Sequence, residues 1–219
     1  MTPVGGRIPR STYRLQVTEE FDLFAAARVL PYLADPKTSR GTRMLYADVL
    51  NYLSHAQPLE QRLATCDEAR KILAELGAKD LSDLRAASIY ADVSDSEARH
   101  ALLLGRVQDA ERLESEVYEI AEGVLAQRPG DLRSMANRAL AADLLASLAI
   151  RRTDFRAAEQ YAAKSALAGE NYVRFNPSDY NSWVYLVRGR DKVANVLNEQ
   201  GRVTDSIDTL QGTVALEND

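Results

Sequence analysis

Cysteine and histidine are scarce in this chain, which has one cysteine and two histidines among 219 residues. A lone Cys66 excludes an intramolecular disulfide framework and any metal site built from several cysteines. His55 and His100 are too few for a histidine-rich metal centre. The sequence therefore predicts no metal and no other cofactor. The single thiol fits a reducing compartment, and on that ground we favour a cytoplasmic location.

Long apolar runs and an excess of basic residues are also missing. The longest apolar stretch, residues 139–150, is interrupted by Asp143 and followed by two arginines, so it is too short and too charged to span a membrane. Residues 1–17 lack the apolar core of a secretory signal. The net charge is -5 with acids and bases intermixed, which leaves no basic face for a phosphate backbone. We expect neither membrane insertion nor nucleic acid binding.

Motifs for catalysis are absent as well. The sequence has no Ser-His-Asp set, no glycine-rich phosphate loop and no paired-carboxylate motif. The many carboxylates in residues 111–122 are typical of a solvated helical face, and His100 is expected at the surface of a charged helix. Cys66 is followed by two acids, a setting that argues against a lowered thiol pKa. An enzyme is therefore disfavoured.

What the sequence does contain is a repeat with a period of 48 residues. The tripeptide Asp-Leu-Arg at 83–85 recurs at 131–133, and Pro129 recurs as Pro177. The tripeptide Gly-Arg-Val at 105–107 returns two intervals later, at 201–203. Independent markers that share one period predict a structural repeat.

Between these markers, apolar residues recur with helical spacing, as in Leu132, Met135, Ala139 and Ala142. Turn residues divide each interval into two helices. The pattern predicts helices over residues 80–103, 106–127, 131–151, 154–175, 179–200 and 203–216. An earlier unit is expected over residues 38–78, and half of another over residues 18–33.

The predicted organisation is one helical repeat domain over residues 18–219, with units at about 38–78, 80–128, 129–176 and 177–217. Residues 1–17 precede it. Their prolines, arginines and paired glycines are typical of a flexible arm or of the edge of the expressed segment.

Small residues occupy equivalent positions in successive units. They are the mid-helix alanines Ala98, Ala146 and Ala194, the internal turns Gly105 and Gly201, the early second-helix residues Ala110, Ala158 and Ser206, and the exit prolines Pro129 and Pro177. This pattern resembles the tetratricopeptide repeat (TPR) family, although the family unit has about 34 residues and this unit is longer. The resemblance implies an all-α fold, a right-handed α-α superhelix or TPR-like solenoid of about four helical hairpins. It also implies that the first helices line a concave, ligand-binding face.

Alignment by the repeat places Asp95, Asp143 and Asp191 in one column, with Asn51 as the equivalent in the first unit. On the concave face that the resemblance implies, this column would form an acidic ladder. Two more groove candidates, Asp92 and Asn195, lie one turn away. The hypothesis is a clamp for a protein or peptide partner with a basic segment.

The alternative is that these acids are structural. Asp95 is spaced to pair with Arg99, and Arg188 with Asp191, on the same helix. Arg138 or Arg190 could instead link the acids between stacked units.

A second candidate is an aromatic docking patch formed by Tyr180, Trp183 and Tyr185, with Tyr172 and Phe175 nearby. Aromatic residues are enriched in interface hot spots. The alternative is that the cluster fills the gap where one long hairpin meets the next.

The function predicted from the sequence is a protein or peptide interaction scaffold that uses the concave face of a helical array. The alternative is a structural, assembly or self-association domain of a larger multidomain protein. The apolar stripe ending at residues 214–216 favours that alternative, because a free solenoid normally ends in a polar capping helix. This alternative includes a homo-oligomer.

Overall fold

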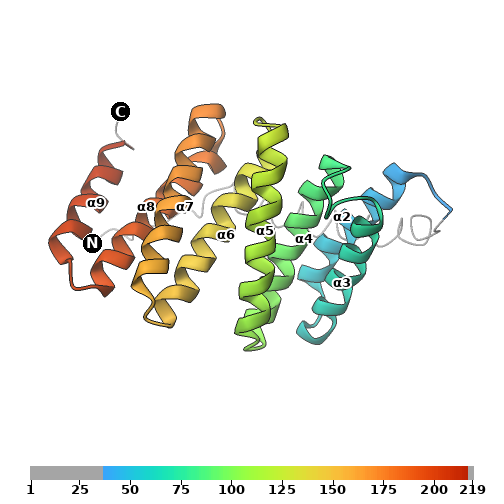
Figure 1. The fold of residues 1–219 in the computed structure, drawn as a ribbon, viewed down its shortest axis with the longest axis horizontal. Coiled ribbons are helices and arrows are strands. Elements are labelled where there is room, and N and C mark those ends of the chain that lie inside the picture. The colour runs from blue at the N-terminus through green and yellow to red at the C-terminus, as the bar shows by residue number, and fades with distance from the viewer. Residues whose placement is uncertain (1–36, 217–219) are drawn as a thin grey trace, which may run out of the picture.

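The computed structural model describes residues 37–216, and that part of the chain contains eight α-helices and no strand. The helices are α2 (Arg40–Ala56), α3 (Leu59–Glu75), α4 (Leu84–Leu103), α5 (Val107–Gln127), α6 (Leu132–Arg151), α7 (Phe155–Phe175), α8 (Tyr180–Glu199) and α9 (Val203–Leu216). Each helix packs against the next, so the helices form a single row (Figure 1). The expected all-α, solenoid-like arrangement is confirmed. The predicted arm at 1–17 and helix at 18–33 lie outside the described residues.

The helices follow the interval of the sequence markers. The first helices α4, α6 and α8 begin at Leu84, Leu132 and Tyr180, which are 48 residues apart. The second helices α5, α7 and α9 begin at residues 107, 155 and 203, again 48 apart. Helix α4 starts four residues later than its predicted bound at 80, because residues 77–83 turn through positive φ at Gly77 (85°) and Leu81 (58°).

Capping explains why the markers recur. Asp83, Asp131 and Asp179 are the N-caps of α4, α6 and α8, and each side chain accepts hydrogen bonds from N–H groups of the first turn. The turn inside each unit needs one residue at positive φ, which Gly105 (75°) and Gly201 (77°) adopt without strain. The equivalent residue of the middle unit is Thr153, at φ 58°.

The contacts between units define the curvature of the row. The first helices touch in sequence, α2 with α4, α4 with α6 and α6 with α8, whereas no Cα of one second helix lies within 8 Å of another second helix. The first helices therefore lie closer to one another than the second helices do. The row must curve so that the first helices line its concave side. We call the exposed side of α2, α4, α6 and α8 the inner face, and that of α3, α5, α7 and α9 the outer face.

Small residues allow the helices to approach closely. Ala98, Ala146 and Ala194 are buried as expected from their column in the repeat. The closest crossing joins α7 and α8, where a Cβ added to Gly169 would lie 2.6 Å from the Cα of Leu186, and one added to Gly189 would lie 2.6 Å from the Cα of Ala166. These two glycines let the backbones of the helices meet directly.

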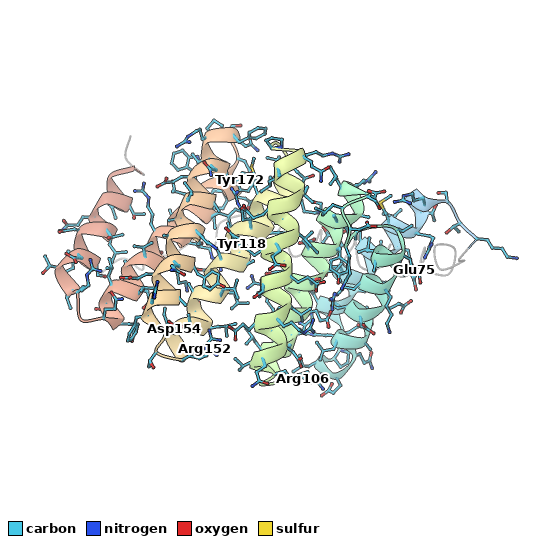
Figure 2. All side chains as sticks on the ribbon, in the orientation of Figure 1. Glu75, Arg106, Tyr118, Arg152, Asp154 and Tyr172 are labelled. Carbon is cyan, nitrogen blue, oxygen red and sulfur yellow. The ribbon has the colours of Figure 1, made fainter. Side chains whose placement is uncertain are left out.

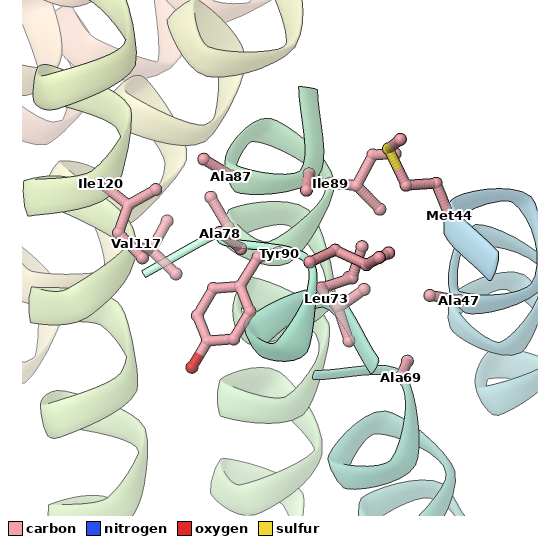
Figure 3. Close-up of a cluster of buried hydrophobic side chains, with 14 of the residues drawn as sticks. Met44, Ala47, Ala69, Leu73, Ala78, Ala87, Ile89, Tyr90, Val117 and Ile120 are labelled. Carbon is pink, nitrogen blue, oxygen red and sulfur yellow. The ribbon is translucent and has the colours of Figure 1, made fainter. Parts of the chain in front are cut away.

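The largest apolar cluster lies at the N-terminal end of the described array. Met44, Leu73, Tyr90 and Val117 bring together α2, α3, α4 and α5 in this cluster (Figure 3). At the other end, α9 exposes an apolar stripe of Val203, Ile207, Leu210 and Val214. Within residues 37–216, none of the helices has the length and apolar character that crossing a membrane requires.

Candidate functional site

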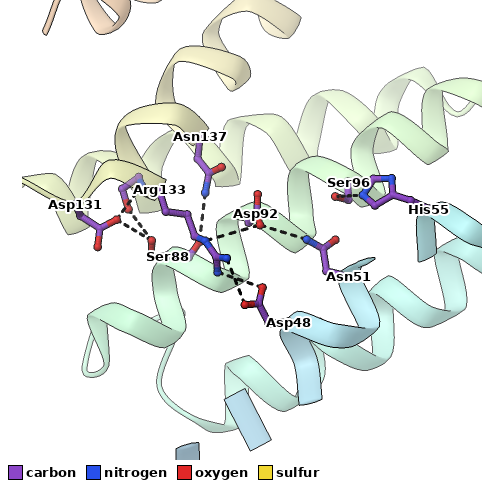
Figure 4. A network of polar contacts seen from close by, with 10 residues as sticks. Asp48, Asn51, His55, Ser88, Asp92, Ser96, Asp131, Arg133 and Asn137 are labelled. Carbon is purple, nitrogen blue, oxygen red and sulfur yellow. Dashed lines mark hydrogen bonds and ion pairs between the residues drawn. The ribbon is translucent and has the colours of Figure 1, made fainter. Parts of the chain in front are cut away.

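Two carboxylates on the inner face share one cation. Arg133 of α6 donates from Nη2 to Asp48 Oδ2 of α2 at 3.3 Å, and its Nε lies 3.9 Å from Asp92 Oδ2 of α4 (Figure 4). Asn51 of α2 donates from Nδ2 to the same Asp92 oxygen at 3.3 Å. Residues from three successive first helices therefore meet, and we call this group, with Tyr52, the Asp48/Asp92 site.

The Asp48/Asp92 site has more acceptors than donors. Asn51 Oδ1 and Asp48 Oδ1 are buried atoms that accept no hydrogen bond from any residue in the described part of the chain. Asp48 Oδ1 does lie 3.2 Å from Arg133 Nη1, close enough for attraction between the charges. Buried acceptors are normally satisfied, so this imbalance marks the group as incomplete.

The charge balance of the site is also uneven. Burial is the largest cause that raises the pKa of Asp92 to about 6, with Asp95 and Asp48 adding to it and Arg133 opposing it. Tyr52, 57% exposed at the edge of the site, has a raised phenol pKa because of partial burial and the nearby Asp48 carboxylate. One guanidinium does not fully compensate the acids around it.

A second group lies deeper, between α4 and α5. Arg99 donates from Nε and Nη2 to the two carboxylate oxygens of Asp95, both at 2.8 Å. Glu114 of α5 is fully buried and accepts no hydrogen bond from an N–H or hydroxyl donor in the described residues. Burial, and then the neighbouring Asp95 carboxylate, raise the pKa of Glu114 well above its usual range. The prediction that the acids of residues 111–122 all face solvent is wrong for Glu114.

The structure divides the predicted acidic ladder. Asp95 is buried and bound to Arg99, which is the local pairing offered as the alternative. Asp143 is bridged to α8 by Arg188 at 3.1 Å and by Lys192 at 3.3 Å. Asp191 is exposed. Asp95 and Asp143 are therefore neutralised within the array, and the partners of Asp143 come from the following unit.

Other residues proposed as linkers or groove candidates have separate places. Arg138 pairs with Glu122 and Arg190 with Glu170, so both join first helices to second helices and not to the acid column. Asn195 is exposed on α8.

The aromatic candidates do not form one surface. Tyr185 stacks on Tyr172 with ring centroids 5.6 Å apart, which is a packing contact between α7 and α8. Tyr180 is 79% exposed, and Trp183 donates from Nε1 to the Pro177 carbonyl at 2.8 Å. Packing explains Tyr185, whereas Tyr180 and Trp183 remain on the surface.

His100 and Cys66 are both buried. His100 is buried, contrary to the expectation of a surface residue, because its helix packs against α2, where Ser54 Oγ lies 3.3 Å from its Nε2. Burial is the largest cause that raises the pKa of the Cys66 thiol to about 11, which agrees with the expected lack of activation. No cluster of three or more histidine, cysteine or acidic residues suited to a metal occurs between residues 37 and 216.

Neither a protein-family model nor a curated protein matches this chain. The function must therefore be inferred from the inner face itself.

Sequence reasoning identified Asn51 and Asp92 but missed Asp48, Arg133 and Tyr52. Asp48 and Arg133 stand 85 residues apart, and the 48-residue period does not relate them. They meet because α2 and α6 both pack against α4 and the Arg133 side chain is long enough to reach acids on both α2 and α4. An excess of acidic over basic residues across three successive first helices is the signal that could have indicated the Asp48/Asp92 site.

Proposed function

We propose that this chain is a TPR-like interaction scaffold whose inner face binds a protein or peptide segment through a lysine or arginine side chain at the Asp48/Asp92 site. One observation carries the proposal: two carboxylates share a single guanidinium, and the buried Asn51 Oδ1 between them accepts no hydrogen bond from the described residues. A lysine or arginine side chain supplies the missing positive charge and the missing N–H donors.

The surroundings favour a cation over a neutral donor. Asp92 is partly exposed, with 31% of its side chain accessible, so an incoming charge can reach it. Tyr52 lies beside it with its ring accessible, and an aromatic face attracts a cation by about 0.5–1 kcal/mol at an exposed site. The Asp48/Asp92 site therefore takes the place of the three-acid ladder as the proposed basic-segment clamp.

Binding should depend on these two acids. We expect a capped peptide of alternating lysine and alanine to bind the native chain, and the double variant Asp48→Asn/Asp92→Asn to bind it roughly tenfold more weakly, since one charge-assisted hydrogen bond is worth about 1.4 kcal/mol in affinity. Isothermal titration calorimetry measures both. Asp109→Asn, an exposed acid on α5 of the outer face, is the matched control and should bind like the native chain.

The pH dependence provides a second readout of the same binding. Because the pKa of Asp92 is raised to about 6, lowering the pH through 6 neutralises this carboxylate and should weaken the peptide complex. The step should vanish in Asp92→Asn. Equal binding of the lysine peptide and of a glutamate analogue, or equal affinities for Asp109→Asn and the double variant, would contradict the proposal.

A further inference from the structure

The outer face carries a hollow that the proposed function does not use. It has a volume of about 340 Å³ and lies where α5, α6 and the C-terminal end of α7 meet. Leu125, Met135 and Phe175 supply its apolar wall, and Arg138 and Arg174 its charged wall. We call it the outer pocket.

The splay of the second helices creates this hollow. No Cα of α5 lies within 8 Å of a Cα of α7, so the two helices leave a gap over the N-terminal half of α6. Lys164 of α7 reaches across to α5, and its Nζ lies 4.7 Å from the ring centroid of Tyr118. Tyr118 is labelled on α5 in Figure 2. This cation–π contact links the two helices although their backbones stay apart.

The two arginines in the charged wall of the outer pocket have N–H groups with no acceptor among the described residues. Arg138 uses Nη1 to bind Glu122 at 2.9 Å, but its Nε is buried and has no partner among the described residues. Arg174 is exposed and makes no hydrogen bond or ion pair within residues 37–216. A guanidinium has five N–H donors, so most of the donor capacity here is unused.

In the apolar wall of the pocket, Leu125 and Met135 are largely buried and pack with Tyr172, whereas Phe175 is exposed. Phe175 is 55% exposed at the last residue of α7, and its ring covers Gly130, where any Cβ would lie 2.6 Å from the ring. Met135 is a flexible side chain that adapts to irregular partners. The exposed Phe175 ring stands next to Arg174, which has no partner within residues 37–216, and this combination matches a ligand that is both apolar and anionic.

We propose that the outer pocket binds a peptide segment in which a bulky apolar side chain is flanked by carboxylates. The apolar side chain packs on Met135 and Phe175, and the carboxylates accept hydrogen bonds from Arg174 and Arg138. This partner is acidic and docks on the outer face, so it is distinct from the basic segment proposed for the inner face. The volume of the pocket suits one aromatic or branched side chain with its neighbouring backbone.

Methionine methyl groups give a direct test. The chain has three methionines, and of these Met135 lines the outer pocket while Met44 is buried in α2. We expect a capped peptide with one phenylalanine between two glutamates to shift the ¹³C-methyl NMR signal of Met135 and to leave that of Met44 unchanged. Peptides with lysine for glutamate, or with alanine for phenylalanine, should shift neither signal.

Variants separate the pocket from general charge attraction. Arg174→Gln should weaken the glutamate peptide roughly five- to tenfold, the loss expected for one charge-assisted hydrogen bond. Arg156→Gln removes the same charge from an exposed position near the other end of α7 and should leave the affinity unchanged. The proposal is overturned if Met135 does not respond to the peptide, if Met44 responds equally, or if the two variants weaken binding to the same extent.

Discussion

Replacing Gly189 by alanine should lower the free energy of unfolding by about 2 kcal/mol, the usual range for an overpacked helix contact. The added Cβ would lie 2.6 Å from the Cα and 2.7 Å from the backbone nitrogen of Ala166, so no side-chain rotation can relieve the clash. The helices α7 and α8 would have to separate, which would also disturb the reciprocal contact at Gly169. This penalty outweighs the gain of about 1 kcal/mol that alanine brings to a helix interior.

The control for this prediction is Gly212→Ala. Gly212 lies on α9, and a Cβ added there has no neighbouring atom within 4 Å. Only the propensity gain then remains, and the stability should rise by about 0.5–1 kcal/mol. Chemical denaturation followed by circular dichroism measures both variants. If Gly189→Ala stabilises the chain as Gly212→Ala does, the close crossing of α7 and α8 is wrong.

Replacing Glu114 by glutamine should stabilise the chain at pH 7, because glutamine has nearly the same shape as glutamate and cannot ionise in this buried position. The pKa of Glu114 is raised in the folded state, by burial first and by Asp95 second. An unfolded glutamate titrates near pKa 4.3, so above that pH the folded state retains a proton that the unfolded state has lost. Stability must therefore fall as pH rises above about 4.3, until the folded-state pKa of Glu114 is passed. Glutamine removes this penalty because it carries no charge at any of these pH values.

The gain from Glu114→Gln should consequently grow with pH and be smallest near pH 4. Glu119→Gln, an exposed position on the same helix, removes a charge without removing a buried acid and should change stability little at any pH. Urea denaturation at several pH values distinguishes the two. A Glu114→Gln gain that does not vary with pH would show that Glu114 is not the group responsible.

Much of the fold follows from local sequence features. The repeat markers predict the helices because each marker acts on the backbone beside it. Asp131 caps α6, and Gly105 turns between α4 and α5 at positive φ. The buried alanine column follows from the same period. By contrast, the turn over residues 77–83 has no counterpart in the later units, so the predicted start of α4 comes too early.

The candidate site is less predictable, because it depends on side-chain reach across the curved row. The repeat places Asp143 in a ladder, but Lys192 and Arg188 of the next unit neutralise it. Glu114 resembles the other acids of a charged helix until the packing of α5 shows that it faces inwards. The repeat indicates which residues are equivalent. It does not indicate which of them a long arginine or lysine side chain from the neighbouring unit can reach.

Site-specific photo-crosslinking tests most directly whether the inner face holds a basic segment. The residues to replace by p-benzoylphenylalanine are Tyr52, at the Asp48/Asp92 site, and Leu167, which is exposed on α7 of the outer face. We predict that a lysine-rich peptide becomes crosslinked at position 52 and not at position 167, and that Asp48→Asn/Asp92→Asn reduces the yield at position 52. Equal crosslinking at both positions, or a yield at position 52 that is unaffected by the loss of both carboxylates, would contradict a basic-segment site on the inner face.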